Sequence, residues 1–322
     1  MKQLSSAFLL CIFALPLMTA CSKKDDNGPG GGGGRAFGTG NIYYDWSEGA
    51  GLAVTYKVDL HSNARSKALA YDPDRHAWDI SRDGSKMIQS VADPNDYDGE
   101  IYRIINMSNG QTISEFKKKG TELSSFTEPL FSPDMTMIAV PPTFDRGLLL
   151  LNMQGQVLKE IVTIGGNKIQ GHIAWMPDNS IICTVGNTIY RLNNSYTYGD
   201  VIANLNFSDW NHVTASNDGT KIAFAGGKHI WLMNADGSDP KQITTSNDEE
   251  GYPVFSPDGK NLLIGTDYVG ETSALQSWKL AIIPADGQQY NVTEGADGRV
   301  IPIVIKDSES TQELCDDIME WR

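Results

Sequence analysis

A short motif recurs five times along the chain and constrains the fold more than any other feature of the sequence. In each copy a short apolar run precedes a polar turn around an aspartate, and a second apolar run follows, as in YPVFSPDGKNLLIG. The turn aspartates, 40 to 51 residues apart, are Asp83, Asp134, Asp178, Asp218 and Asp258. Proline sets φ, aspartate bonds its own nearby backbone, and glycine or asparagine accepts a positive φ. Each motif therefore predicts two strands joined by a tight turn.

The sequence after each motif supplies further strands. A third apolar run and another turn follow, for example IWLMNADGSDPKQIT at 230–244 and KLAIIPADGQQYNVT at 279–293. Units of this length with four strands each are typical of β-propeller blades. The five copies therefore predict five blades.

The two ends of the chain are expected to build a sixth blade. The run VIPIVI at 300–305 aligns with the inner-strand segment YPVF at 252–255. NIYYDW at 41–46 and LAVTYKVDL at 52–60 are then the middle and outer strands of the same blade. Closing a ring in this way removes exposed sheet edges. We therefore predict an all-β fold, a six-bladed β-propeller over residues 39–306 closed by N- and C-terminal strands.

The tail, residues 307–322, is expected to form a short helix packed on one face of the ring. Ser310 and Glu313 have the spacing of a capping box. One helical face would carry Leu314, Ile318 and Trp321. The alternative to a packing element is a functional plug.

The repeats also resemble those of a known family. FSPDGKNLLIG at 255–265, with IWLMNADGSDPKQIT before it, resembles the Ser-Pro-Asp-Gly propeller repeat of the Tol–Pal translocation protein TolB. The propellers of tricorn protease and of prolyl oligopeptidase relatives are similar. The resemblance covers about residues 40–305 and implies a six-bladed ring. A TolB-like function would make the protein a periplasmic component of an envelope complex.

The first 20 residues have the form of a secretory signal peptide. Lys2 precedes the apolar run AFLLCIFALPLM, which is too short to remain as a membrane span. Met18-Thr19-Ala20 followed by Cys21 resembles the bacterial lipobox, in which the cysteine thiol carries lipid. We expect lipidation at Cys21, the alternative being an ordinary secreted protein.

Residues 21–38 are a glycine-rich linker that carries a short charged segment near its start. That segment, which resembles the export signal of Bacteroidetes surface lipoproteins, is Lys23, Lys24, Asp25 and Asp26. We therefore expect an outer-membrane lipoprotein exposed at the cell surface and held to the membrane by its lipid. The alternative is a generic solvated linker.

The net charge and the absence of catalytic motifs reduce the range of functions that the sequence supports. The chain has 26 basic and 40 acidic residues and a net charge of −14, so it lacks the basic surface that nucleic acids require. No G-x-S-x-G, H-E-x-x-H or G-x-x-x-x-G-K-[ST] motif occurs. These observations favour a non-enzymatic module that binds a protein or a glycan, with no cofactor expected apart from a possible divalent metal.

One set of residues is expected to form a ring around the propeller channel. Inner strands line the channel, so equivalent positions on successive blades must lie at one height. Six residues before each turn aspartate stand Ala77, Glu128, His172, His212 and Tyr252, and alignment adds Ile301. Two histidines and a carboxylate from consecutive blades, Glu128, His172 and His212, are candidate ligands of a divalent metal. The alternative is that both histidines bond neighbouring backbone.

Aromatic residues suggest a second function for this ring of residues, the rim of the channel. Trp210 is next to His212, and with Tyr252 it could stack against a sugar or a peptide aromatic. Core or loop packing is the alternative, and Trp175, within an inner strand, is assigned to the core.

The rim also resembles that of a known enzyme family. Oligogalacturonate lyases are similar propellers with related repeats, whose histidines near the channel bind manganese. They have seven blades, and this chain has only two such histidines, His172 and His212. The resemblance implies an alternative function, a metal-dependent polysaccharide lyase or hydrolase that uses Glu128 and the two histidines.

Overall fold

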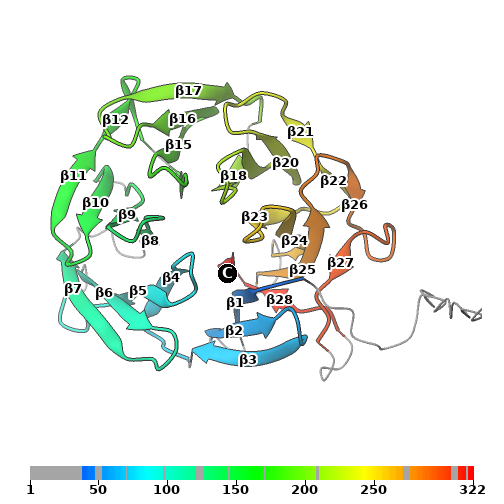
Figure 1. Ribbon diagram of the computed structural model, residues 1–322, viewed down its shortest axis with the longest axis horizontal. Coiled ribbons are helices and arrows are strands. Elements are labelled where there is room, and N and C mark those ends of the chain that lie inside the picture. Colours follow the sequence, from blue (N-terminus) through cyan, green and yellow to red (C-terminus); the bar gives the residue numbers. More distant parts are fainter. Residues whose placement is uncertain are drawn as a thin grey trace, which may run out of the picture. The chain divides into compact units, whose positions relative to one another are not determined.

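The strands form a ring of six four-stranded blades around a central axis (Figure 1). The computed structural model describes residues 38–47, 53–69, 71–96, 99–119, 127–143, 146–169, 171–207, 210–270, 276–305, 311–316 and 318–322. The expected signal peptide, Cys21 and the linker up to residue 37 lie outside the described residues. The predicted six-bladed, all-β architecture is confirmed.

Each blade is an antiparallel sheet whose strands follow one another from the channel to the outside of the ring. Blade 1 contains β29 (Met319–Trp321), β1 (Asn41–Ser47), β2 (Ala53–Asp59) and β3 (Ala64–Leu69). Blade 2 contains β4 (Arg75–Ile80), β5 (Lys86–Ala92), β6 (Gly99–Asn106) and β7 (Thr112–Lys119). Blade 3 contains β8 (Leu130–Phe131), β9 (Met137–Val140), β10 (Leu148–Asn152) and β11 (Val157–Ile161).

The other three blades follow in chain order. Blade 4 contains β14 (Ile173–Trp175), β15 (Ile181–Val185), β16 (Thr188–Leu192) and β17 (Gly199–Asn204). Blade 5 contains β18 (Trp210–Ala215), β19 (Lys221–Gly226), β20 (His229–Asn234) and β21 (Lys241–Gln242). Blade 6 contains β23 (Gly251–Phe255), β24 (Asn261–Val269), β25 (Ser277–Pro284) and β27 (Ile301–Pro302), and β28 (Leu314–Cys315) also pairs with β25. Two further short pairs are β12 (Thr163–Ile164) with β13 (Asn167–Lys168), and β22 (Thr244–Thr245) with β26 (Tyr290–Asn291).

The core consists of six apolar clusters, one between each pair of neighbouring blades. Strand β10 shows how one sequence serves two of them. Leu148 and Leu150 belong to the cluster shared with blade 4, and Leu149 and Leu151 to the cluster shared with blade 2. Alternate side chains of a strand point to opposite faces, and both faces of β10 are covered, so a continuous leucine run is buried.

The five predicted tight turns are present and use the chemistry that the motif suggested. In blade 3 the Ser132 hydroxyl donates to Asp134 Oδ1 at 2.8 Å, and the backbone N–H of Thr136 donates to the same oxygen at 3.1 Å. The N–H of Met137 donates back to Ser132 Oγ at 2.9 Å. The residue after each aspartate is left-handed, with φ between 60° and 71°: Gly84, Met135, Asn179, Gly219 and Gly259.

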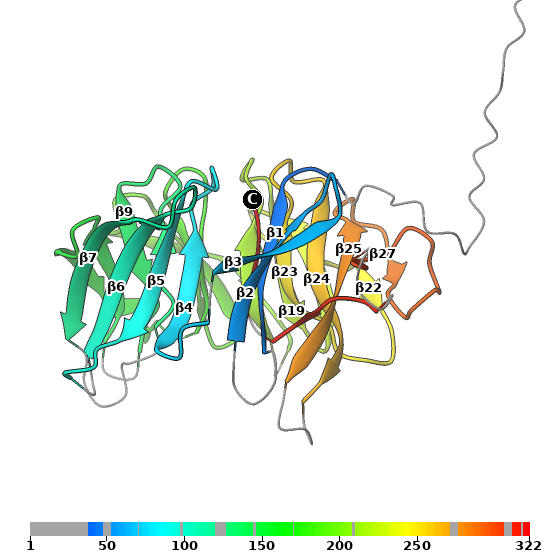
Figure 2. The ribbon, with the colours of Figure 1, turned by 90° about the horizontal axis from the view of Figure 1, so that it is seen from below.

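The ring has two faces: inner strands run along the channel, as β4 does in Figure 2, and β4, β8, β14, β18 and β23 each lead into one of the five aspartate turns. We call the end that carries the five aspartate turns the aspartate face. Hydrogen bonds link neighbouring turns at this face. Asn179 Nδ2 of blade 4 donates to Asp134 Oδ2 of blade 3 at 2.5 Å, and Asn217 Nδ2 of blade 5 donates to the Pro257 carbonyl of blade 6 at 3.1 Å. The opposite end, where β14, β18 and β23 begin beside His172, His212 and Tyr252, is called the histidine face.

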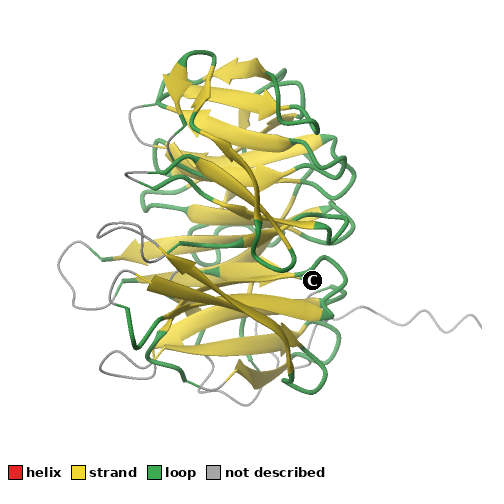
Figure 3. Ribbon diagram, turned by 90° about the vertical axis from the view of Figure 1, so that its left-hand side faces the viewer, coloured by secondary structure: helices red, strands yellow, loops and turns green. Residues whose placement is uncertain are grey.

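The predicted C-terminal helix is wrong. The described part of the tail forms β28 and β29, and Figure 3 shows strands and loops but no helix in the described chain. Burial alternates with a period of two, because the buried residues are Glu313, Cys315, Met319 and Trp321. The tail is extended because β1 would otherwise present an unpaired edge, and that tertiary demand overrides the local helical pattern. Ser310 lies outside the described residues.

The predicted closure of the ring by both ends of the chain is confirmed. The assignment of residues 300–305 to the innermost strand of that blade is wrong. Strand β29 pairs with β1 in the register Ile42↔Trp321 and Tyr44↔Met319. Residues 301–302 instead form β27, which pairs with β25 at the outside of blade 6. Ile301 is therefore not part of the channel ring. The described chain contains no helix long and apolar enough to cross a membrane.

Candidate functional site

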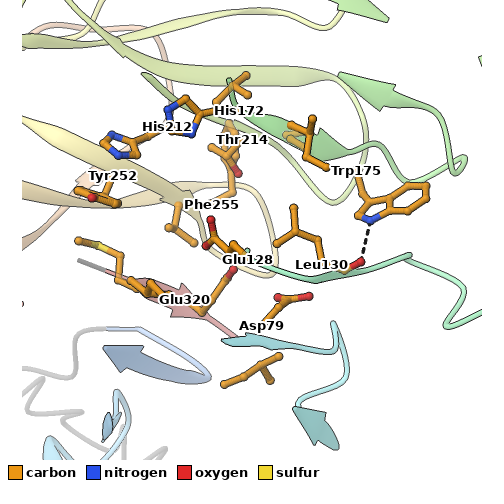
Figure 4. A pocket seen from close by; sticks show the side chains of 18 of the residues that line it. Asp79, Glu128, Leu130, His172, Trp175, His212, Thr214, Tyr252, Phe255 and Glu320 are labelled. Atoms are coloured by element: carbon orange, nitrogen blue, oxygen red, sulfur yellow. Dashed lines mark hydrogen bonds between the residues drawn. The ribbon is translucent and has the colours of Figure 1, made fainter. Parts of the chain in front are cut away.

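A cavity of about 350 Å³ lies on the propeller axis and is lined by residues of all six inner strands or of the segments directly before them. The five ring positions taken from the repeats all line it: Ala77, Glu128, His172, His212 and Tyr252. Figure 4 shows the two histidines beside Tyr252, with Glu128 nearer the middle of the cavity. Trp210 is the first residue of β18, and its side chain lies outside the described part of the structure.

Three of these side chains form a stack at the histidine face. The His212 and Tyr252 rings have centroids 3.5 Å apart and planes 27° from parallel. The His172 and His212 centroids are 5.1 Å apart, with planes 54° from parallel. The repeat register therefore does bring these three residues together.

The stack depends on a repeated backbone irregularity. Pairing between β18 and β19 passes from Asn211↔Ala225 to Thr214↔Ala223, so two residues oppose one at His212. The same bulge occurs at Tyr252 in blade 6. Both His212 and Tyr252 have a φ of 50°, a left-handed conformation that costs about 1–2 kcal/mol for a residue with a Cβ atom. Strain of this kind, repeated in two blades, is a feature that functional sites retain.

His212 is held neutral inside the site. Burial, and to a lesser extent the neighbouring His172, lowers the pKa of His212 to about 3. Its Nδ1 atom is buried and has no hydrogen-bond partner among the described residues. A buried polar atom of this kind is destabilising by roughly 1–3 kcal/mol, so a ligand that bonded to it would recover that energy.

The predicted metal set is only partly assembled. His172 and His212 are adjacent and Glu128 lines the same cavity, but the described residues include no group of three His, Cys, Asp or Glu side chains placed to hold a metal ion. The metal site therefore remains a prediction, supported only by the proximity of His172 to His212.

His76 also lines the cavity. The alignment of the repeats did not identify it as a ring residue. Burial lowers its pKa, against the opposing effect of nearby carboxylates. Counting back from the turn aspartate selected Ala77, because the bulge in blade 2 lies at His76 and not at the position used in blades 5 and 6. A one-residue difference in bulge position leaves no signal in the repeat.

A charge network built on the buried Asp79 and the partly buried Glu320 and Arg322 closes the aspartate-face end of the cavity. Arg322 donates to Asp79 Oδ1 at 3.2 Å, to the Ile80 carbonyl at 2.7 Å, and pairs with Glu320 at 2.7 Å. Asp79 Oδ2 also accepts the backbone N–H of Phe131 at 2.7 Å, which ties blades 1, 2 and 3 together. Burial raises the pKa of Glu320 to about 7, although Arg322 opposes the shift. Because the tail was expected to be helical, sequence reasoning missed this network.

An aromatic row continues outward from the stack. The Tyr252 ring meets the edge of Trp278 at 5.6 Å, and Tyr268 stacks on Trp278 at 4.5 Å. Trp278 is buried beneath two glycines, since a Cβ at Gly251 or Gly265 would lie 2.8 Å or 2.9 Å from it. The glycines thus leave the space in which one indole supports both tyrosines.

Comparison with known proteins identifies the architecture. No protein-family model and no curated protein matches the sequence. Among solved structures, TolB from Acinetobacter baumannii aligns with a TM-score of 0.59 and 19% identity, over 88% of this chain and 66% of that one. The fold is TolB-like.

Two further solved structures are similar to this chain. A protein described as a TolB from Agrobacterium tumefaciens aligns with a TM-score of 0.55 and 15% identity, over 78% of this chain and 86% of that one. An oligogalacturonate lyase in complex with manganese has a TM-score of 0.46 and 14% identity, over 76% and 71% of the two chains. At 15% to 19% identity the likeness to the two TolB structures shows the fold alone.

Proposed function

We propose that this TolB-like propeller is a non-enzymatic binding module of the cell envelope, held by lipid at Cys21 in the outer membrane and exposed at the cell surface. It binds a ligand at the histidine face, where the channel opens between blades 4, 5 and 6. The anchor and its location rest on the resemblance of residues 18–26 to lipoprotein signals.

The observation that carries the binding role is the state of His212. Its Nδ1 is buried without a partner among the described residues, and its backbone is left-handed. Both features destabilise the fold and both lie in the wall of one cavity. A protein retains such a combination when it serves a purpose other than stability.

The size and lining of the cavity suit a small group or the end of a chain. Its volume of about 350 Å³ is within the usual range for small-molecule sites, which present aromatic surface with a few fixed polar groups. Tyr252 and His172 supply ring faces, and His212 and Glu128 supply polar atoms.

Binding to immobilised full-length protein tests the proposal. A solubilised envelope extract and a glycan array are offered to wild type, to His212→Gly and to Asn217→Ala, which alters the aspartate-face end of the same cavity. We expect a ligand that wild type and Asn217→Ala retain and that His212→Gly loses. Equal retention by all three, or by none, contradicts the proposal.

Localisation is tested separately. We expect wild type to fractionate with the outer membrane and to be degraded when protease is added to intact cells. Cys21→Ala should be released from the membrane. A protein protected from the protease would favour the alternative, a TolB-like periplasmic component of an envelope complex.

The second candidate function, a metal-dependent polysaccharide lyase or hydrolase, is favoured only by the proximity of His172 and His212. Elemental analysis after dialysis tests it. Stoichiometric divalent metal that is lost in the His172→Ala/His212→Ala double variant would support the enzyme. No metal in a correctly folded wild type would leave the binding module.

A further inference from the structure

We infer that the ligand is a neutral oligosaccharide, with its terminal sugar at the channel mouth over His172 and Tyr252 and its chain running outward past Tyr268. This inference rests on the proposed binding function and names its ligand class. We call the side chains His172, His212, Tyr252, Trp278 and Tyr268 the aromatic row.

The aromatic row is continuous and leads from the cavity to the surface of blade 6. Successive ring centroids are 5.1, 3.5, 5.6 and 4.5 Å apart from His172 to Tyr268. His172 is exposed, and His212, Tyr252 and Tyr268 are partly exposed. The buried Trp278 fixes Tyr252 on one side and Tyr268 on the other. Two contact rings held by one buried ring form a rigid, elongated platform.

Polar groups flank this platform along its length. Glu128 and the unbonded Nδ1 of His212 lie at its inner end. At its outer end Asp267 precedes Tyr268 and pairs with Lys279 at 2.6 Å. A sugar offers an apolar face to an aromatic ring and hydroxyl groups around its edge, which both donate and accept hydrogen bonds. The row places aromatic rings beside polar atoms at both of its ends, which matches that chemistry.

Charge argues against an acidic saccharide. The charged residues that line the cavity are Asp79, Arg82, Glu128, Glu320 and Arg322. Arg322 is already bound to Asp79 and Glu320, and burial keeps His212 neutral. Arg82 belongs to the aspartate turn of blade 2, so the described lining holds no lysine or arginine at the histidine-face end, and the net charge of −14 repels polyanions.

Backbone geometry argues against an extended peptide. Peptides that bind to sheet edges need a regular run of hydrogen-bonding groups along one strand. Strands β18 and β23 both lose that regularity at the rim, where bulges interrupt pairing at residues 211–214 and 251–254. A bulge re-aims side chains and ends pairing, so recognition at this rim falls to rings and side-chain polar atoms.

Titration calorimetry with the full-length protein in detergent tests the inference. The probes are neutral gluco-, xylo-, manno- and chito-oligosaccharides of two to six units, with oligogalacturonates as acidic counterparts. We expect at least one neutral series to bind, with affinity rising with chain length, and the acidic series to bind at least about tenfold more weakly.

Two variants locate the bound chain, and two more serve as controls. Tyr252→Gly removes the ring while suiting the left-handed backbone, and should weaken binding by about tenfold or more. Tyr268→Ala should weaken the longer oligosaccharides by about three- to tenfold and the disaccharide by less than twofold. Tyr198→Ala removes an exposed tyrosine that directly precedes β17, the outer strand of blade 4, and should change nothing. Tyr252→Phe, which keeps the ring, guards against a loss of folding and should bind within about threefold of wild type.

The outcomes separate this inference from the proposed function. Preference for the acidic series, or neutral binding that neither Tyr252→Gly nor Tyr268→Ala weakens, overturns the saccharide assignment. If no sugar binds but an envelope protein is retained in a His212-dependent way, the saccharide inference fails and the binding function stands. If neither class binds, both fail.

Discussion

The same inner strands end in two different ways at the two faces of the ring. At the aspartate face the aspartate of each of the five repeat turns accepts a hydrogen bond from a neighbouring serine hydroxyl, and the left-handed position is occupied by glycine in three blades. At the histidine face three inner strands begin with a bulge, and in two of them the left-handed positions carry the large side chains of His212 and Tyr252. One end is optimised for stability, whereas the other accepts strain around a cavity.

This difference predicts that substitutions at the aspartate face affect stability, whereas substitutions at the histidine face affect binding. Changes at the aspartate-face end should lower the free energy of unfolding and leave ligand affinity unchanged. Changes at the histidine face should lower ligand affinity and leave the free energy of unfolding nearly unchanged.

The largest expected effect is that of Arg322→Ala. The substitution leaves the buried Asp79 and the partly buried Glu320 without their guanidinium partner, and should lower the free energy of unfolding by about 3–5 kcal/mol. Urea denaturation measures the change. Arg103→Ala is the matched control, because its pair with Glu115 is exposed, and it should lose less than about 1 kcal/mol. Similar losses in both variants would contradict the role of the network.

Glu320→Gln should change how stability depends on pH. The pKa of Glu320 is raised to about 7, so the folded state holds its proton where the unfolded chain has released it. Its contribution is present below the unfolded pKa near 4.5 and is lost as pH rises towards 7. Above pH 7.5 the variant should be more stable than wild type by roughly 1–3 kcal/mol. Unfolding midpoints from pH 4 to pH 9 would show parallel curves if this interpretation is wrong.

Asp218→Ala should lower the free energy of unfolding by about 1–2 kcal/mol, because Asp218 accepts hydrogen bonds from Ser216 Oγ at 2.6 Å and from the N–H of Thr220 at 2.9 Å. These bonds depress the pKa of Asp218. The stabilisation is therefore present above the unfolded pKa and declines as pH falls through the folded one. Thermal melts at pH 7 and pH 3 should differ less in the variant than in wild type. Ligand affinity should not change.

His212→Gly should lower the free energy of unfolding by less than about 1 kcal/mol, despite its central position. Relief of the left-handed backbone and removal of the buried Nδ1 offset the lost contact with Tyr252. Urea denaturation beside Asp218→Ala makes the comparison direct. A loss larger than that of Asp218→Ala would mean that the histidine face is built for stability after all.

The smallest effect is expected at the one turn where methionine takes the left-handed position. Met135→Gly, at a φ of 60°, should raise the free energy of unfolding by about 0.5 kcal/mol, because relieved strain exceeds the lost packing. Met153 borders the same apolar cluster without a positive φ, so Met153→Gly should be destabilising. Thermal melts of the pair would refute the strain argument if both variants lost stability.

The blades could be predicted from the sequence because their turns are determined locally. Ser132, Asp134 and Thr136 bond to one another within five residues, so the pattern and the structure coincide. The register of the ring followed from the same turns and brought His172, His212 and Tyr252 together.

The rest could not be predicted because it depends on distant partners. The conformation of Met319–Trp321 is set by β1, at the other end of the sequence, and not by the helical pattern of the tail. The charge network around Arg322 was hidden for the same reason. His76 escaped because bulge position depends on how two strands pair, and a repeat alignment does not record that.

The pairing of Ile42 with Trp321 also has a consequence for biogenesis. During synthesis β1 leaves the ribosome long before β29 is made. Blade 1 cannot be completed until β29 is available, so in the interval β1 has a hydrogen-bonding edge with no strand to pair with. Protection of that edge by a chaperone, or rapid folding of the intervening blades, would then govern the yield of closed rings.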